Sequence, residues 1–539
     1  MKLYQGKCII PGIAIGPVYM IQQQNREISR NTVENPEKEI QRFLKAKSAA
    51  VKQLEMLYNK TRLKIGEKEA LIFQSHQMII EDLDFINKVV NMISSDKVDA
   101  EYAVTVVGKE FAEIFGQMDD EYIRARAVDV IDASQSIVSV LRGCNITDLH
   151  IEKPVIIVAE DLAPSEVVRF DKHKILAFVT KKGSANSHTA ILARMINVPF
   201  IIVDGIQLNP EINNKQAIVD GHTGEFILEP DTGKIQIYKA KQEEERKKIA
   251  SLAKLKGADT VTKSGKKIKL YANIGGPDDL DMVLANDAEG IGLFRSEFLY
   301  LGRNDYPSEE EQYQAFKEVI SKMKGKKTII RTLDIGSDKQ ASYFDLPREA
   351  NPAMGFRAIR ICLQKVDIFK TQLRAIYRAA VYGNTAVMFP MITSIDEIRK
   401  IKEIIKEVKE ELKNKKANFG EAELGIMIET PAAVMISDEL AKEVDFFSIG
   451  TNDLVQYTLA VDRQNQSLEH YYNHNHKAVM RMIKMTIDNA HDAGIWCGIC
   501  GEMAADLEMT EELIRLGVDE LSVSPAFILP LREKIINID

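Results

Sequence analysis

Residues 445–454 read DFFSIGTNDL, a largely apolar run that meets a glycine and is followed at once by Asn452 and Asp453. A short run of this kind, bounded by turn residues, is typical of a buried strand. Asn452 and Asp453 would therefore lie just beyond the carboxyl end of that strand. The stretch predicts a strand whose end carries polar, chemically useful side chains.

Similar runs recur through the C-terminal half of the chain and alternate with stretches of helical pattern. Eight are found, at 268–274, 290–294, 328–333, 386–391, 424–428, 446–449, 496–499 and 521–523. Eight strands separated by helices predict a (β/α)8 TIM barrel over residues 259–539. An open doubly wound sheet is the alternative, but its usual glycine-rich fingerprint is missing.

Barrel enzymes place their chemistry at the carboxyl ends of the strands, so the polar residues at these ends form one candidate site. They are Arg295, Arg331, Glu429, Asn452, Asp453 and Cys500, with Arg357 and Arg463 in following loops. Arginine forks match phosphate and carboxylate groups, and a carboxylate pair such as Glu429 and Asp453 suits Mg²⁺. The residues indicate a small phosphorylated carboxylate as substrate.

Cys497 and Cys500 form a CxxC pair, which can also signal a redox or zinc site. A single pair without a second one is weak support for either. A thiol at the end of a barrel strand can act as a general acid. We assign that role to Cys500 and expect Cys497 to be a strand residue facing elsewhere.

The N-terminal half has a different pattern of apolar and polar residues. Residues 1–20 and 145–235 carry short apolar runs and predict a small α/β domain, whereas residues 21–144 predict an inserted helical domain. Its apolar stripe includes Ile72, Ile79, Leu83 and Ile93, and His76 within the stripe is expected to be structural. Residues 236–258, rich in Lys, Glu and Ala, predict a linker helix.

Residues 183–194 of the α/β domain read GSANSHTAILAR and place His188 at what the pattern predicts to be the first turn of a helix. The N–H groups at a helix start stabilise negative charge. A phosphorylated His188 would suit this position. A lone histidine near a helix start is more often a cap or a packing residue, so the interpretation depends on the rest of the chain.

Composition narrows the function classes. The chain has 539 residues, 45% hydrophobic, with 71 Lys and Arg against 79 Asp and Glu for a net charge of −8. This balance argues against general binding to nucleic acid or anionic membranes. No apolar run approaches a membrane span and the N-terminus lacks a signal-peptide pattern, so we expect a cytoplasmic protein. Five cysteines fit a reducing compartment.

Six blocks, in this order along the chain, resemble the phosphoenolpyruvate-utilising enzymes. They are SHTAILAR at 187–194, GLFRSEFLY at 292–300, RTLDIG at 331–336, NPAMGFR at 351–357, DFFSIGTNDL at 445–454 and CGEMA at 500–504. The order of domains is similar to that of the Enzyme I proteins of the bacterial sugar phosphotransferase system. Ser184 and Asn186, which precede His188, differ from the residues that this family usually carries at these two positions.

The resemblance implies an activity and a set of roles. His188 would accept the phosphoryl group of phosphoenolpyruvate, which Arg295, Arg331, Asn452 and Arg463 would bind. Glu429 and Asp453 would hold Mg²⁺, and Cys500 would protonate the enolate to give pyruvate. The helical domain would dock the histidine-containing phosphocarrier protein HPr, and the barrel would form a homodimer.

Two rival functions remain to be weighed. A phosphoenolpyruvate synthase or pyruvate phosphate dikinase shares the histidine domain and the barrel, but needs an ATP-binding domain for which the helical segment offers neither the length nor a glycine-rich phosphate loop. A catalytically idle scaffold or regulator that binds HPr has no physical need for arginines, carboxylates and a thiol together.

Overall fold

The computed structural model describes the chain in two compact units, Met1–Lys247 and Lys248–Asp539. The described residues are 1–21, 29–64, 67–117, 127–143, 151, 153–162, 174–183, 193, 198–301, 303, 305–336, 342–346, 349–463 and 465–539. Among them, no helix combines the length and the apolar character needed to cross a bilayer.

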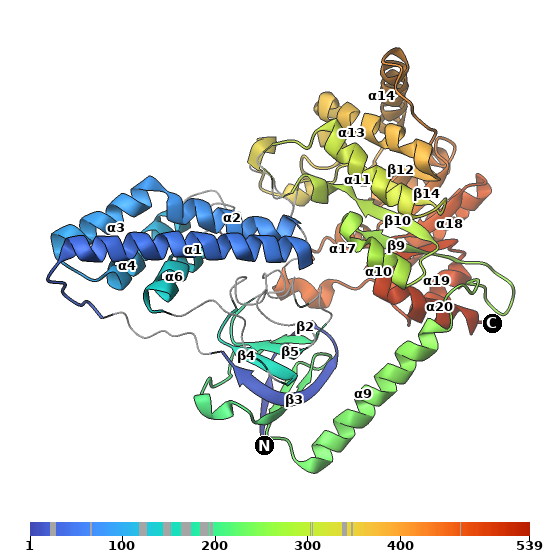
Figure 1. Cartoon of the computed structure of the whole chain (residues 1–539). Helices are drawn as coiled ribbons and strands as arrows, with labels where there is room; N and C mark the ends of the chain where they lie inside the picture. The colour runs from blue at the N-terminus through green and yellow to red at the C-terminus, as the bar shows by residue number, and fades with distance from the viewer. Residues whose placement is uncertain are drawn as a thin grey trace. The chain divides into compact units, whose positions relative to one another are not determined.

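The first unit contains an eight-stranded mixed sheet (Figure 1). Its strands are β1 (Lys2–Gln5), β2 (Lys7–Ile10), β3 (Ile13–Met20), β4 (Val155–Ala159), β5 (Ile175–Thr180), β6 (Phe200–Ile202), β7 (Gln216–Asp220) and β8 (Glu225–Leu228), in the order β1-β8-β7-β3-β4-β5-β6-β2. The N-terminal β3 pairs parallel with β4 and antiparallel with β7. Strands from both sides of the helical segment thus build one sheet, as the sequence predicted.

Between β3 and β4 the chain forms long helices that pack on one another (Figure 1). They are α1 (Pro36–Lys64), α2 (Glu67–Glu81), α3 (Leu83–Asp96), α4 (Ala100–Gly116) and α6 (Ala127–Leu141). The predicted stripe is wrong in detail, because Leu83 is 73% exposed while Phe85 is buried. Asp82 accepts hydrogen bonds from the backbone N–H groups of Asp84 and Phe85, which starts a new helix and resets the buried face.

Helix α9 (Thr232–Ala253) begins in the first unit and packs against its sheet. Ile235 and Tyr238 join an apolar cluster with residues of β3, β7 and β8. The Tyr238 hydroxyl donates to Glu225 at 2.6 Å, and the Gln242 amide donates to the Ile13 carbonyl at 2.7 Å. The first part of the predicted linker is therefore fixed to the sheet by both apolar and polar contacts.

The second unit is a closed barrel of eight parallel strands, which confirms the predicted TIM fold (Figure 1). The strands are β9 (Lys269–Ile274), β10 (Gly290–Arg295), β11 (Thr328–Arg331), β12 (Thr385–Phe389), β13 (Glu423–Ile428), β14 (Phe446–Ile449), β15 (Trp496–Ile499) and β16 (Glu520–Val523). The last strand closes the barrel by pairing in parallel with the first. Each strand falls within two residues of the apolar run that predicted it, because eight buried strands need eight such runs.

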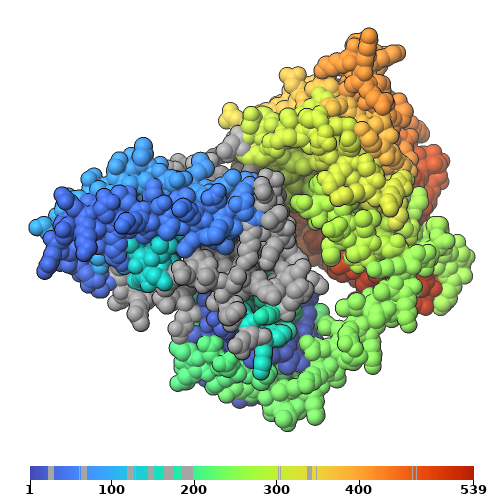
Figure 2. Space-filling model, in the orientation of Figure 1, coloured from blue at the N-terminus to red at the C-terminus, as the bar shows by residue number. Residues whose placement is uncertain are grey.

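Helices form the outer layer of the barrel. They include α10 (Leu280–Ala285), α11 (Glu309–Lys322), α12 (Ile359–Gln364), α13 (Val366–Ala379), α14 (Ile395–Asn414), α15 (Pro431–Met435), α16 (Ser437–Leu440), α17 (Thr451–Leu459), α18 (Lys477–Asp492), α19 (Thr510–Leu516) and α20 (Ile528–Ile536). In Figure 2, the surface that residues of α11, α13 and α14 contribute to this unit is coloured from yellow-green to orange. The apolar faces of these helices therefore have the sheet as their partner.

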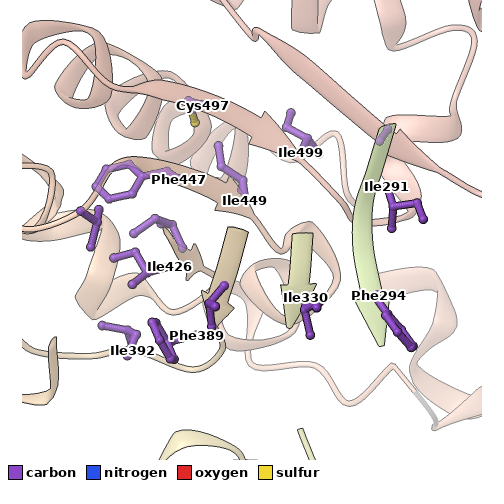
Figure 3. Packing of buried hydrophobic residues seen from close by; sticks show 14 of the residues in the cluster. Ile291, Phe294, Ile330, Phe389, Ile392, Ile426, Phe447, Ile449, Cys497 and Ile499 are labelled. Atoms are coloured by element: carbon purple, nitrogen blue, oxygen red, sulfur yellow. The ribbon is translucent and has the colours of Figure 1, made fainter. Parts of the chain in front are cut away.

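Alternate residues of each strand face the helices or the barrel interior. The helix-facing set includes Ile330 of β11 and, on the neighbouring strands β14 and β15, Phe447, Ile449 and Cys497 (Figure 3). A separate interior cluster contains Leu293, Met388, Met427, Phe446 and Cys500, among others. This period of two puts Cys497 and Cys500 in different layers, as expected for a pair that does not act together.

Candidate active site

The sequence-predicted barrel residues all lie at the carboxyl ends of the strands. Arg295 ends β10, Arg331 ends β11 and Glu429 directly follows β13. Asn452 and Asp453 occupy the first turn of α17, and Cys500 directly follows β15. Arg357 precedes α12, and Arg463 follows α17. The fold thus brings together one end of every strand that was predicted to carry a polar side chain.

Arg331 is the centre of a buried group of charges. Its side chain, 6% exposed, contacts Glu297 at 2.5 Å and Asp334 at 3.0 Å. Burial works against the charge of Arg331, but the carboxylates of Glu297 and Asp334 outweigh it and raise its pKa above the usual value. Arg331 is therefore a permanent positive charge held in a fixed direction.

Asp334 extends this group to a second arginine. Its other oxygen contacts Arg357 at 3.0 Å, and Arg357 also contacts Asp453 at 3.2 Å and the Tyr457 hydroxyl at 3.2 Å. Burial again disfavours the charge, yet Asp334 and Asp453 raise the pKa of Arg357. Arg331, Asp334, Arg357 and Asp453 are thus linked through carboxylates that alternate with guanidinium groups.

The backbone around Arg357 and Glu429 adopts unusual conformations that support this arrangement. Gly336 has φ +109°, and a side chain there would meet Arg357 Cβ at 2.5 Å, so only glycine allows the approach. Ala358 and Met391 have φ values of 51° and 59°. Such strain in non-glycine residues persists where surrounding contacts fix it, and it clusters at functional sites.

Glu429 has the donor chemistry of a metal ligand. Its carboxylate is 1% exposed, and one oxygen accepts the Met391 N–H at 2.7 Å. The other oxygen has no hydrogen-bond partner among the described residues. Burial, followed by the nearby Asp453 and Asp334 carboxylates, raises the pKa of Glu429 to about 8. A cation beside this oxygen would relieve both the missing partner and the repulsion between carboxylates.

Glu429 and Asp453 fit a hard divalent cation that takes its remaining oxygens from substrate and water. The described residues contain no group of three or more His, Cys, Asp or Glu side chains placed to hold a metal. Mg²⁺ is commonly bound through one or two carboxylates together with substrate phosphates. Two carboxylates are sufficient for such a site.

Two neighbouring cavities open at this end of the barrel. One, of about 500 Å³, is lined by Arg357, Asp453, Tyr457 and Arg463, among others. The second, of about 360 Å³, is lined by residues that include Arg295, Asn452 and Cys500. Because Asn452 and Asp453 are consecutive residues, the cavities adjoin at the start of α17.

Arg295 differs from Arg331 and Arg357 because it forms no ion pair with any described residue. It borders the smaller cavity, and burial together with the positive charge of Arg331 lowers its pKa. A guanidinium in this position lacks its counter-ion. The cavity beside it is therefore prepared for an anionic ligand.

Cys500 borders the same cavity with a thiol that is 4% exposed. Burial raises the pKa of Cys500 to about 12, with a smaller opposing effect from the Ser448 hydroxyl. The thiol therefore keeps its proton at neutral pH, which a general acid requires. Asn452 is fixed nearby by two hydrogen bonds with Glu502, one to its side chain and one from its backbone N–H.

Tyr457 is a site residue that sequence reasoning missed. It lies four residues after Asp453 in α17, donates to the Ala353 carbonyl and contacts Arg357. The spacing of four was available as a signal, because such residues share a helix face. An isolated tyrosine in a helix gave no further reason to choose it.

The histidines have different fates. His188 lies outside the described residues, as do Ser184 and Asn186. His76 is fully buried beside Phe73 in the helical segment, with Asp129 at 3.8 Å. In the group at 470–476, His470 packs on Tyr471 and His474 faces Asp506 at 3.7 Å, while His476 caps α18. These three imidazoles have separate partners.

Family models match three successive parts of the chain. The "PEP-utilising enzyme, N-terminal" model matches residues 5–126 and the "PEP-utilising enzyme, mobile domain" model matches residues 151–224. The "PEP-utilising enzyme, PEP-binding domain" model matches residues 249–539, more than half of the chain. The chain belongs to the phosphoenolpyruvate-utilising enzymes.

Curated relatives extend this match over nearly the whole length. Proteins named phosphoenolpyruvate-protein phosphotransferase from Priestia megaterium and Geobacillus stearothermophilus are 40% and 41% identical. The alignments cover 99% of this chain and 94% and 93% of those proteins. A solution structure titled Enzyme I (nEIt) is 32% identical, covering 45% of this chain and 99% of that one with a TM-score of 0.39.

These relatives confirm the predicted class of activity. The chain is an enzyme that uses phosphoenolpyruvate for phosphoryl transfer. The family is consistent with a requirement for a divalent metal.

Proposed function

We propose that the chain transfers the phosphoryl group of phosphoenolpyruvate to its own His188 and then to the phosphocarrier protein HPr, releasing pyruvate. The observation that supports this most directly is Arg295, a buried guanidinium without an ion-pair partner among the described residues, beside a cavity that also holds Asn452 and Cys500. A substrate with two anionic groups, a phosphate and a carboxylate, and with a carbon that takes up a proton fits this combination of cation, amide and thiol.

Each barrel residue has a distinct role in this proposal. Arg295, Arg331 and Arg463 bind the phosphate and carboxylate of phosphoenolpyruvate, and Arg357 holds Asp453 in place while facing the larger cavity. The Asn452 amide orients the substrate, since its own position is fixed by Glu502. Phosphoryl transfer needs positioning and charge neutralisation more than covalent assistance, and these residues supply both.

Glu429 and Asp453 hold Mg²⁺ in this proposal, and the ion supplies positive charge for the phosphoryl and enolate oxygens. The unpartnered oxygen of Glu429 supports the assignment. Arg357 leaves one Asp453 oxygen uncommitted, because its contact is to the other.

The proton and phosphoryl steps involve His188 and Cys500. The neutral imidazole of His188 attacks phosphorus, and the bond from phosphorus to the enol oxygen breaks. The Cys500 thiol then gives its proton to the methylene carbon of the enolate, which becomes the methyl group of pyruvate. The raised pKa of Cys500 keeps the thiol protonated until that moment.

The division of labour along the chain follows the predicted boundaries. Residues 1–20 and 145–235 form the phosphohistidine domain, residues 21–144 dock HPr, residues 236–258 link the parts and residues 259–539 bind phosphoenolpyruvate and form a homodimer. Because His188 must reach both the barrel and HPr, the phosphohistidine domain has to move between them. Exchange with a phosphocarrier of the sugar phosphotransferase system takes place in the cytoplasm.

Labelled phosphoenolpyruvate tests the central step. With Mg²⁺ present, the wild-type chain should gain acid-labile label, and His188→Ala should gain none. His222→Ala serves as the matched control, because His222 is a half-exposed histidine of the same unit that contacts Glu245 and should leave labelling unchanged. Label retained in His188→Ala would refute the assignment.

A further inference from the structure

One side of the barrel interior is polar, and the polar side lies next to Cys500. Strand register places Ser448 of β14, Gly498 of β15 and Glu520 of β16 at the same level. Gly498 lies two residues before Cys500 on the same strand, so both face the interior. Cys500 therefore sits one level above the gap that Gly498 leaves between a hydroxyl and a carboxyl group.

Two glycines make the space that the Glu520 side chain occupies. A side chain at Gly498 would meet the Glu520 carboxyl oxygen Oε2 at 2.1 Å, and one at Gly292 would meet Oε1 at 2.8 Å and the Ser522 hydroxyl at 1.8 Å. Glu520 and Ser522 thus share the pocket left by Gly292. Any larger residue at either glycine position would displace them.

Glu520 is 1% exposed, and Oε1 has no hydrogen-bond partner among the described residues. The same holds for the hydroxyls of Ser448 and Ser522. Burial raises the pKa of Glu520 well above its usual range, with a smaller opposing effect from the Ser522 hydroxyl. The protonated, neutral form of Glu520 is therefore favoured, and this form has a proton to give.

Stability does not account for this side chain. An unpartnered buried carboxyl group costs free energy that an apolar residue of similar size would not. The other side of the same interior is lined by Leu293, Ile329, Met388 and Met427, which shows that an apolar filling suits the barrel. Ser448, Glu520 and Ser522 lie on the strands next to the one that leads to Cys500.

The hydroxyls of Ser522 and Ser448 lie on the two strands that flank the strand leading to Cys500. Ser522 lies beside Glu520 and one level higher on β16, and the Ser448 hydroxyl acts on the Cys500 thiol from the neighbouring strand. Asn273 holds the upper end together, because its amide donates to the carbonyls of Cys500 at 3.3 Å and Ser522 at 3.0 Å. Hydroxyl groups can accept one proton while donating another.

We propose that Glu520 is a proton-supplying residue that recharges Cys500 from inside the barrel, through the hydroxyls of Ser522 and Ser448. The inference rests on the proposed function, in which Cys500 gives a proton to the enolate in every turnover. A thiolate left in the site would block the next turnover until it regained that proton. A supply from below works even while the product still occupies the cavity above.

The protons balance at each step. The S–H bond of Cys500 breaks as the C–H bond of pyruvate forms, and the thiolate then takes the carboxyl proton of Glu520 through the hydroxyls. Glu520 becomes a carboxylate, which the Lys269 ammonium group stabilises. It recovers a proton from solvent at the amino-terminal end of the barrel, where a cavity of about 730 Å³ is lined by Lys269, Lys327 and Trp496, among others.

The first turnover separates this role from a structural one. Cys500 is already protonated in the resting enzyme, so Glu520→Gln should release its first pyruvate at the wild-type rate. Later turnovers, measured with Mg²⁺, phosphoenolpyruvate and an excess of HPr, should slow by about tenfold to a hundredfold. Rapid-quench measurement of pyruvate would then show a burst that the wild type lacks, and Ser522→Ala should show a weaker form of it.

A matched control and a second variant keep the test decisive. Glu289→Gln removes a carboxylate that accepts from Thr260 in the same barrel, and both of its phases should stay unchanged. If Glu520→Gln does not fold, Ser522→Ala is read by the same two phases. A steady rate within twofold of wild type, or an equal loss in both phases, would overturn the relay.

Cys500→Ala distinguishes the relay from the proposed function beneath it. The variant should lose the first pyruvate altogether. If it retains a wild-type first turnover, the proposed role of Cys500 fails. If Cys500→Ala loses the first turnover while Glu520→Gln keeps its steady rate, the relay alone is wrong.

Discussion

Two networks of ion pairs in the barrel unit use the same chemical groups in different surroundings. At the carboxyl end of the strands, Arg331 and Arg357 are buried with their carboxylates. On the outer layer, Arg374 of α13 joins Glu309 of α11 to Glu411 of α14 through side chains that are 16–35% exposed. The outer network fastens helices, whereas the inner one leaves Arg295 and a Glu429 oxygen unmatched. Charged groups that lack a partner indicate a binding site, whereas charged groups that are fully paired indicate a structural contact between helices.

The largest difference between the networks should appear when one arginine is removed from the inner one. Arg331→Met removes the ion pairs of Arg331 with the buried carboxylates of Glu297 and Asp334. The variant should lose about 3–5 kcal/mol of unfolding free energy and should no longer be phosphorylated by phosphoenolpyruvate. Denaturant titration followed by fluorescence of the only tryptophan, Trp496, measures the loss in the barrel itself. Arg331→Lys should lose less stability, and an unchanged midpoint for Arg331→Met would contradict a strained inner network.

In the absence of metal, Glu429→Gln should stabilise the protein, whereas Arg331→Met should destabilise it. The pKa of Glu429 is raised to about 8 by burial, compared with roughly 4.3 in an unfolded chain. The folded chain holds the extra proton between these values, so metal-free stability falls as pH rises from about 4.3 to about 8 and is level above. In the presence of a chelator at pH 8.5, Glu429→Gln should therefore have a higher melting temperature than the wild type and an unfolding free energy that is larger by at least about 1 kcal/mol. This gain should shrink towards pH 5.

Mg²⁺ should reverse that ranking at pH 8.5. The ion should raise the melting temperature of the wild type by binding the ionised carboxylate and have a smaller effect on Glu429→Gln. A variant that melts lower than wild type in chelator at pH 8.5 would show that Glu429 is already satisfied without a metal.

The outer network should tolerate the same kind of change. Arg374→Met removes contacts to Glu309 and Glu411 that are partly hydrated, so it should cost about 1 kcal/mol or less and leave pyruvate release unchanged. Parallel denaturation curves in low and high salt provide the measurement, because screening should shrink the cost. A loss as large as that of Arg331→Met would erase the distinction between the networks.

The smallest effect is expected at the start of α11. Glu311 accepts from the Ser308 N–H and pairs with Arg303, and the Arg303 contact leads the interactions that lower its pKa to about 2. This contribution is complete above roughly pH 4.3 and is lost as pH falls towards 2. Because the side chain is half exposed, Glu311→Gln should cost only about 0.5 kcal/mol at pH 7 and less at pH 3.

The strands of the barrel could be predicted because each buried strand requires an apolar run in the sequence. The site residues at the strand ends could be predicted because the fold brings all carboxyl ends of the strands together. The ion-pair partners of these residues could not be predicted, because the contact of Arg331 with Glu297 rather than with another carboxylate depends on the stagger of the strands. Glu520 was missed for a related reason. In the sequence VDELSV it is indistinguishable from a surface charge, and only the closed barrel turns it inward. Leu83 was misplaced because the cap at Asp82 breaks the helical period.

The closing pair of the barrel, β16 with β9, also sets an order of events during synthesis. Leu270 must wait for Leu521, which leaves the ribosome roughly 250 residues later, or about 10–50 s at ordinary rates of elongation. The helices between Pro36 and Leu141 contact one another across at most 105 residues, so their delay is shorter. Arg532 of α20 then bonds Asp287 and the Leu255 carbonyl, joining the last helix to residues that flank the first strand. A nascent chain would thus carry a finished helical bundle while its barrel still exposes apolar strands to chaperones.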